Sequence, residues 1–186
     1  MAKAILSSAL AGLRGRLDGM VFRLRAGQTV VAPRPKRTAR VGTPAQLAVR
    51  ERFSRAAAFG RSVMADPALR ALYAGTPPNE GKCYLAAMTD ALRAPVIDAL
   101  ETSAFRGAIG DPIVIRARDD HGVTAVSVAV KAAAGNVLEE GRASAADGAW
   151  RYVATRSVSA GSTVTVEATA TDRPGNATTV TRSVTV

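Results

Sequence analysis

The chain has 186 residues and carries 25 basic against 15 acidic side chains, which gives a formal net charge of +10. Its single cysteine excludes an intrachain disulfide, and its single histidine excludes a metal site built from several histidines of one chain. No run of residues approaches the ~20 apolar positions that a membrane helix requires, so we expect no membrane insertion.

The net charge is concentrated at the N-terminal end. The first 60 residues hold twelve Lys or Arg side chains and two acidic ones, so the remainder of the chain is neutral. Such asymmetry indicates a segment that engages an acidic partner, or one that a neighbouring subunit buries.

Residues 1–42 predict a basic arm that contains a β-hairpin. Residues 20–25 and 28–32 flank the dipeptide Ala26-Gly27, a pattern typical of a two-residue hairpin turn. Because a lone hairpin is marginally stable in water, we expect this one to dock on another surface, either its own helical zone or a neighbouring subunit. The predicted assembly interface comprises Met20, Phe22, Leu24, Val30, Arg23 and Arg25.

Residues 33–40 predict an extended segment, because each proline disfavours helix at the preceding residue and the cations repel one another. An extended cationic ribbon could follow a phosphate backbone, and a solvated charged linker is the alternative interpretation. The segment has no aromatic side chain to stack on bases, which disfavours single-strand binding. The candidate polyanion-binding residues are Arg34, Lys36, Arg37 and Arg40.

Residues 43–94 predict a helical zone. Thr43 as N-cap, Pro44 at the first helical position and Gln46 to close a capping box mark the start of the first helix. Its expected apolar face consists of Val49, Phe53, Ala56, Ala57, Gly60 and Met64.

Two shorter helices are expected to follow the first. Asp66-Pro67 predicts the start of the second helix, and residues 75–79 predict a loop. A third helix is expected over residues 82–93, with Leu85, Met88 and Leu92 on its apolar side.

Residues 95–186 alternate apolar and polar side chains with period two, segment after segment. Gly- and Asp-containing turns separate the segments, so we expect six or seven short strands in an antiparallel β-sandwich. The adjacent pair Glu139-Glu140 is interpreted as a solvated hairpin end.

Three motifs in this region carry a family resemblance: GDPIVIRARDDHGV (110–123), AGNV (134–137) and ATATDRPGN (168–176). Through them the C-terminal half resembles bacterial immunoglobulin-like domains, which implies a two-sheet sandwich and no particular function. Residues 15–22 and 43–53 more loosely resemble uncharacterised bacterial and phage-associated proteins. The expected fold class is α+β: a basic β-hairpin arm (1–42) and a small helical zone (43–94), followed by an all-β immunoglobulin-like sandwich (95–186).

No catalytic constellation is apparent, so we expect neither an enzyme nor a cofactor. His121 lies in a predicted turn with no marked nucleophile beside it, and no histidine lies near Cys83 in the sequence. Asp119, Asp120 and Asp172 could converge at one end of the sandwich as calcium ligands. The favoured interpretation is that they serve as turn residues, with no metal.

The sequence therefore favours a structural subunit that self-assembles into a filament or virion-like assembly and displays the immunoglobulin-like domain. A nucleic-acid or polyanion-binding protein that uses the basic arm is the alternative, and an exported surface adhesin is a third hypothesis. The N-terminal residues lack a classical signal peptide, so synthesis in the cytoplasm is expected, with the final location open.

Overall fold

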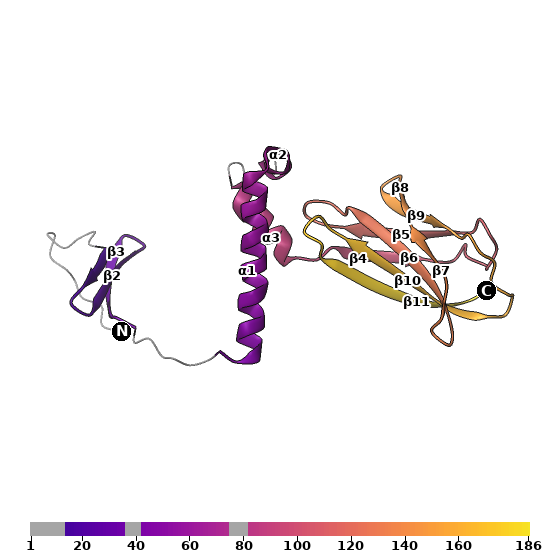
Figure 1. The fold of residues 1–186 in the computed structure, drawn as a ribbon, viewed down its shortest axis with the longest axis horizontal. Helices are drawn as coiled ribbons and strands as arrows, with labels where there is room; N and C mark the ends of the chain where they lie inside the picture. The colour runs from indigo at the N-terminus through magenta and orange to yellow at the C-terminus, as the bar shows by residue number, and fades with distance from the viewer. Residues whose placement is uncertain (1–13, 36–41, 75–81) are drawn as a thin grey trace. The chain divides into compact units, whose positions relative to one another are not determined.

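The structure, a computed structural model, describes residues 14–35, 42–74 and 82–186. The chain divides into two compact units, Met1–Thr43 and Pro44–Val186. Within the described residues, three helices and three antiparallel sheets make a mixed α+β protein (Figure 1). No helix in these ranges is both long enough and apolar enough to span a membrane.

The first unit contains a three-stranded sheet in the order β1-β2-β3, formed by Gly15–Leu17, Met20–Arg25 and Gln28–Pro33. The predicted hairpin is β2 and β3, and β1 is an additional strand. Both connections are two-residue turns, Asp18-Gly19 and Ala26-Gly27, and all four residues have positive φ between 41° and 78°. This backbone conformation matches the turns that suit the right-handed twist of a hairpin.

The second unit begins with three helices: α1 (Pro44–Ala65), α2 (Pro67–Ala74) and α3 (Cys83–Leu92). The predicted cap of α2 is confirmed, because the Asp66 carboxylate accepts hydrogen bonds from two backbone N–H groups of the first turn, at 2.8 and 3.3 Å. The loop predicted at residues 75–79 lies outside the described residues.

The apolar stripe of α1 is only half covered. Ala56 and Gly60 are buried, whereas Val49 and Phe53, which continue the same stripe toward the N-terminus, are 67% and 56% exposed. Met64, the last residue of the predicted stripe, is 41% exposed as well, so burial is confined to the middle of the stripe. The N-terminal half is uncovered because the helices differ in length: the 22 residues of α1 span about 33 Å and the 10 residues of α3 about 15 Å. Figure 1 shows α1 extending beyond α3 at its N-terminal end.

Where α1 and α3 meet, they pack through small residues. A Cβ on Gly60 would lie 2.8 Å from Cε2 of Tyr84, so the glycine permits the close approach. The guanidinium group of Arg52 also donates a hydrogen bond to the carbonyl oxygen of Leu92 in the last turn of α3.

The buried face of α3 agrees with the predicted apolar side only in part. The buried positions are Cys83, Ala86, Ala87, Met88 and Asp90, whereas Leu85 is 56% exposed. Of the predicted apolar residues, Met88 is therefore buried and Leu85 is not.

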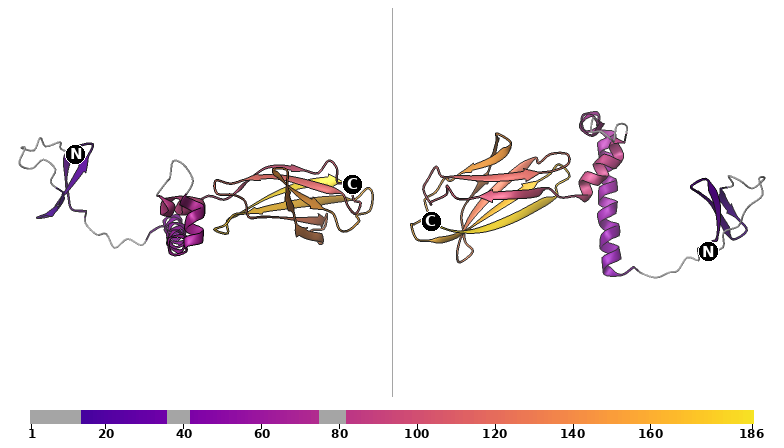
Figure 2. Two further views of the ribbon diagram at one scale, coloured as in Figure 1. Left: turned by 90° about the horizontal axis from the view of Figure 1, so that it is seen from above. Right: turned by 180° about the vertical axis from the view of Figure 1, so that it is seen from behind.

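The rest of the second unit consists of two four-stranded antiparallel sheets (Figures 1 and 2). Their strand orders are β4-β5-β9-β8 and β11-β10-β6-β7. The strands are β4 (Val96–Glu101), β5 (Pro112–Arg118), β6 (Ala125–Ala132), β7 (Val137–Arg142), β8 (Ser144–Ala146), β9 (Ala149–Val153), β10 (Thr163–Thr171) and β11 (Ala177–Thr185). We call these eight strands and their connections the β-domain.

One hydrophobic core lies between the two sheets. Ile113 and Ile115 of β5 and Tyr152 of β9 pack in the same cluster as alternate residues of β6 and β10. The latter are Val126, Val128, Val130, Val164, Val166, Ala168 and Ala170, each at most 2% exposed. The period-two pattern therefore identified the inward positions of the central strands correctly.

Glu139 is a clear exception to the sequence interpretation. Its side chain is 5% exposed, and its Oε2 accepts hydrogen bonds from the Tyr152 hydroxyl, from Thr155 and from the Arg156 N–H. The neighbouring Glu140 is exposed, as expected. The pair is therefore a strand segment with one carboxylate on each side of the sheet, not a solvated hairpin end.

Candidate functional site

The three-stranded sheet of the first unit is amphipathic. In an antiparallel sheet, directly paired residues share a face and neighbours along a strand alternate. The pairing therefore places one set of apolar side chains together on one face: Leu17, Met20, Phe22, Leu24 and Val31. Of these, Phe22 is 9% exposed, while Leu17 and Met20 are 62% and 43% exposed.

The opposite face of this sheet is basic. Arg16, Arg23 and Arg25 share it, and all three are exposed. Val30 pairs with Arg23 and so lies on this basic face, away from Met20, Phe22 and Leu24. The structure thus divides the predicted assembly residues between two faces and adds Leu17 and Val31 to the apolar one.

The candidate polyanion-binding residues are only partly within the described ranges. Arg34 is described and exposed, and its backbone N–H donates to the Gly19 carbonyl. Lys36, Arg37 and Arg40 lie outside the described residues. The four ion pairs found across residues 14–35, 42–74 and 82–186 are all formed by residues from Arg93 onward.

A second candidate site joins α3 to the β-domain. Carboxylate oxygens of Asp90, Asp119 and Asp172 all lie within 4.8 Å of one another. Asp90 belongs to α3, Asp119 follows β5 and Asp172 follows β10, so three segments that are distant in sequence meet here. We call these three residues the carboxylate cluster.

Each carboxylate of the cluster is oriented by hydrogen bonds. Asp172 Oδ1 accepts from the backbone N–H groups of Gly175 and Asn176 at 2.9 and 2.6 Å. The backbone N–H of His121 donates to Asp119 Oδ2 at 2.9 Å. The hydroxyl of Tyr73, a fully buried residue of α2, donates to Asp90 Oδ2 at 2.5 Å.

The surroundings raise the pKa values of Asp90 and Tyr73. Burial raises the pKa of Asp90, and the neighbouring charges of Asp119 and Asp172 add to the increase, while the Tyr73 hydroxyl opposes it. Burial and the hydrogen bond to Asp90 raise the pKa of Tyr73 well above its ordinary value. The ionised form of Asp90 is therefore disfavoured in this poorly solvated position.

Side chains around the cluster connect the helices to the β-domain. The amide nitrogen Nδ2 of Asn176 donates to the carbonyl oxygens of Asp90 and Arg93, at 3.2 and 2.9 Å. The ring of His121 lies 4.8 Å from that of Tyr73, and the guanidinium of Arg173 lies 5.9 Å from the centre of the same ring. His121 is therefore half-buried against Tyr73, more enclosed than an exposed turn residue.

Of the three aspartates named from the sequence, the structure brings two together. Asp119 and Asp172 lie in the cluster, whereas Asp120 forms an exposed ion pair with Arg93 at 2.7 Å. Sequence reasoning missed Asp90. The available signal was its position three residues after Ala87 and seven after Cys83, on the buried face of α3.

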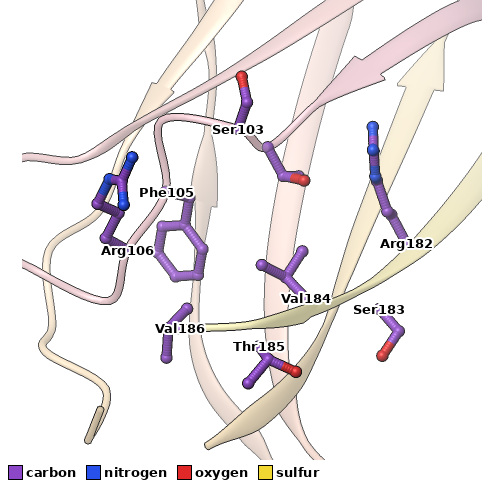
Figure 3. Close-up of a pocket in the computed structure, with 9 residues that line it drawn as sticks. Ser103, Phe105, Arg106, Arg182, Ser183, Val184, Thr185 and Val186 are labelled. Atoms are coloured by element: carbon purple, nitrogen blue, oxygen red, sulfur yellow. The ribbon is translucent and has the colours of Figure 1, made fainter. Parts of the chain in front are cut away.

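A cavity of about 360 Å³ lies at another place on the β-domain, between the segment after β4 and the end of β11 (Figure 3). Arg106 and Arg182 flank it, and Phe105 lies between them in the view of Figure 3. Its lining also includes hydroxyl groups such as those of Ser103 and Thr185, but no carboxylate side chain, histidine or cysteine. It therefore offers no nucleophile with an adjacent base.

The sequence comparisons yield no relatives: no family model and no curated protein matches this chain. Among solved structures, the chain is similar to an engineered protein whose crystal structure was determined at 1.98 Å, with 19% sequence identity and a TM-score of 0.37. The match covers 60% of this chain and 28% of that chain, so this chain spans less than a third of that structure's length. No inference about function follows from so distant a similarity.

Proposed function

We propose that this chain is a non-enzymatic structural subunit that assembles with copies of itself and displays an immunoglobulin-like β-domain. The observation that carries the proposal is the amphipathic three-stranded sheet, whose apolar face is too small to form a core by itself. A matching apolar surface exists in the second unit, along the uncovered half of the α1 stripe at Val49 and Phe53.

The occupant we assign to that half of α1 is the apolar face of the sheet from a neighbouring copy. The stripe continues directly from the buried contact between α1 and α3, so a docked sheet would extend an existing interface. A contact between two different surfaces of the same chain is head-to-tail, and it propagates as a filament when the rotation does not close a ring. A filament or virion-like assembly is the form we propose.

The strand order supports the immunoglobulin-like assignment of the β-domain. In chain order, its first, second, sixth and fifth strands form one sheet, and the eighth, seventh, third and fourth form the other. Immunoglobulin-like sandwiches place strands A, B, E and D in one sheet and C, F and G in the other, which corresponds to this order with one added strand beside C. Such domains serve many functions, so the assembly proposal rests on the first unit and α1.

Replacing Val49 and Phe53 together with serine should weaken self-association at least 100-fold, because well-packed apolar anchors each contribute more than about 1.4 kcal/mol, a factor of ten. Deleting residues 1–42 should abolish it. Sedimentation velocity over a concentration series measures both effects, and circular dichroism checks that the helices and the β-domain remain folded.

The matched control is Leu72→Ser, which removes an exposed leucine of α2 that lies outside the stripe. This variant should assemble like the parent. The proposal is wrong if the parent protein is monomeric at every concentration, or if the Val49 and Phe53 variant assembles as strongly as the parent.

A second candidate function is binding to nucleic acid or another polyanion, and the basic face of the sheet favours it. Arg16, Arg23 and Arg25 are exposed together on that face, and none of them forms an ion pair with a described residue. Because the apolar and basic faces are opposite each other, the sheet could engage a neighbouring copy and a polyanion at the same time.

Polyanion binding predicts a steep dependence on salt. The slope of log K against log salt steepens by about 0.9 for each phosphate neutralised, so replacing Arg16, Arg23 and Arg25 with serine should make it shallower by about 2.7. Fluorescence anisotropy with a labelled DNA duplex between low and physiological salt measures the slope. Replacing the exposed Arg142 and Arg151 of the β-domain is the control and should leave the slope unchanged. Absence of binding at low salt would exclude this function.

A further inference from the structure

The carboxylate cluster gathers more negative charge than its surroundings balance. Three carboxylates lie within 4.8 Å of one another, and Asp90 and Asp172 are only 1% and 3% exposed. The basic side chains recorded beside the cluster are His121 and Arg173, and both lie against the ring of Tyr73. Arg93, at the end of α3, is instead paired with Asp120. Like charges at this separation disfavour ionisation unless a cation compensates them.

A second observation is independent of the clustering. Asp90 Oδ1 is fully buried and accepts no hydrogen bond from any described residue, although Oδ2 of the same carboxylate is bonded to Tyr73. A buried carboxylate oxygen without a partner loses its hydration and gains nothing in return, so such atoms normally accept a hydrogen bond or bind a metal ion. This orphaned oxygen belongs to the same side chain that approaches Asp119 and Asp172.

The donor set selects a class of ion. The cluster offers carboxylate oxygens and contains no thiolate or imidazole, which is the ligand chemistry of hard cations such as Ca²⁺. The hydrogen bonds from Tyr73, the His121 N–H and the Gly175 N–H hold the three carboxylates in place, as outer partners do in metal sites. Carbonyl oxygens and water would complete the six to eight oxygens that Ca²⁺ takes.

We propose that Asp90, Asp119 and Asp172 bind a calcium ion that fastens helix α3 to the two adjacent loops of the β-domain. The Asn176 amide already donates hydrogen bonds to the carbonyl oxygens of Asp90 and Arg93, so α3 is connected to the loop after β10. The ion would add a second connection between the same elements. The ion would make the connection between the helices and the β-domain stiff. This role is independent of how the chain assembles.

The test uses the full chain, stripped of metal with a chelator. Titration calorimetry should detect one Ca²⁺ per chain, with weaker binding of Mg²⁺, which prefers octahedral geometry and retains its water. At 100 times the dissociation constant, Ca²⁺ should raise the melting temperature by about 5 °C or more. Asp119→Asn should weaken Ca²⁺ binding at least tenfold and remove the thermal shift.

Asp120→Asn is the matched control, because Asp120 is the adjacent aspartate and lies outside the cluster in an exposed ion pair. It should bind Ca²⁺ like the parent. Without metal, Asp119→Asn should be at least as stable as the parent, since it removes one of three repelling charges, and this separates a lost ligand from a damaged fold. No calorimetric signal and no thermal shift with millimolar Ca²⁺ would overturn the proposal. The proposal would also be overturned if Asp119→Asn kept the Ca²⁺-induced thermal shift. Tight binding of Zn²⁺ by a protein that does not bind Ca²⁺ would overturn it as well.

Discussion

Val128→Asp should unfold the β-domain. Val128 is 1% exposed and lies near the middle of β6, between Ala168 of β10 and Gly141 of β7. Its side chain points into the hydrophobic core shared by both sheets, and none of the residues that form this core is cationic. A carboxylate at this position costs several kcal/mol through lost solvation, which is comparable with the whole stability of a typical domain, about 5–15 kcal/mol.

Ser127→Asp is the matched control, because Ser127 is the preceding residue of the same strand and is exposed on the opposite face. It should melt within a few degrees of the parent. Urea unfolding followed by the fluorescence of Trp150 compares the two variants. If Val128→Asp retained a cooperative transition at the parent's midpoint, the assignment of Val128 to the core would be wrong.

The sequence predicted the inward positions of the β-domain well because period-two alternation reflects local geometry. Successive side chains of a strand point to opposite faces whatever the strand packs against, so Val126, Val128 and Val130 had to share a side. The same reasoning located the Asp66 cap, where the carboxylate needs only the N–H groups of its own helix.

The helical zone was harder to predict because burial there depends on the length and position of a partner helix. The spacing of Val49, Phe53, Ala56 and Gly60 identified one stripe correctly, yet nothing in the pattern shows where α3 stops covering it. Strand β1 was missed although Asp18-Gly19 is a strong hairpin dipeptide, because only three residues precede the turn in the strand.

The carboxylate cluster shows a different limit of sequence reasoning. Asp119 and Asp172 could be paired in advance because both follow predicted strands and lie in turns that were expected at one end of the fold. Asp90 comes from a helix, and only the packing of α3 against the β-domain brings it to them. When side chains from separate elements come together, their spacing in the sequence has no characteristic value. The contact therefore cannot be predicted from spacing.

Glu139 was misinterpreted for a related reason, and its replacement tests the corrected view. Glu139→Ala should lower the free energy of unfolding by about 3 kcal/mol, because the Tyr152 hydroxyl is buried and would lose its acceptor. Three further donors bond to the same oxygen: the N–H and hydroxyl of Thr155, at 2.7 and 2.8 Å, and the Arg156 N–H, at 3.1 Å. Without the carboxylate they would need water as an acceptor. The measurement is the urea dependence of Trp150 fluorescence.

Glu140→Ala provides the comparison within the same strand. Glu140 is exposed and pairs with Ala129 across the sheet, so its removal should change stability by no more than about 0.5 kcal/mol. Glu139→Gln should fall between the two, because its amide oxygen can still accept from Tyr152 and Thr155 while its NH₂ group takes the place of an oxygen that has no hydrogen-bond donor within the described residues. Equal stabilities for the Glu139→Ala and Glu140→Ala variants would mean that the buried carboxylate does not hold the segment after β9 against β7.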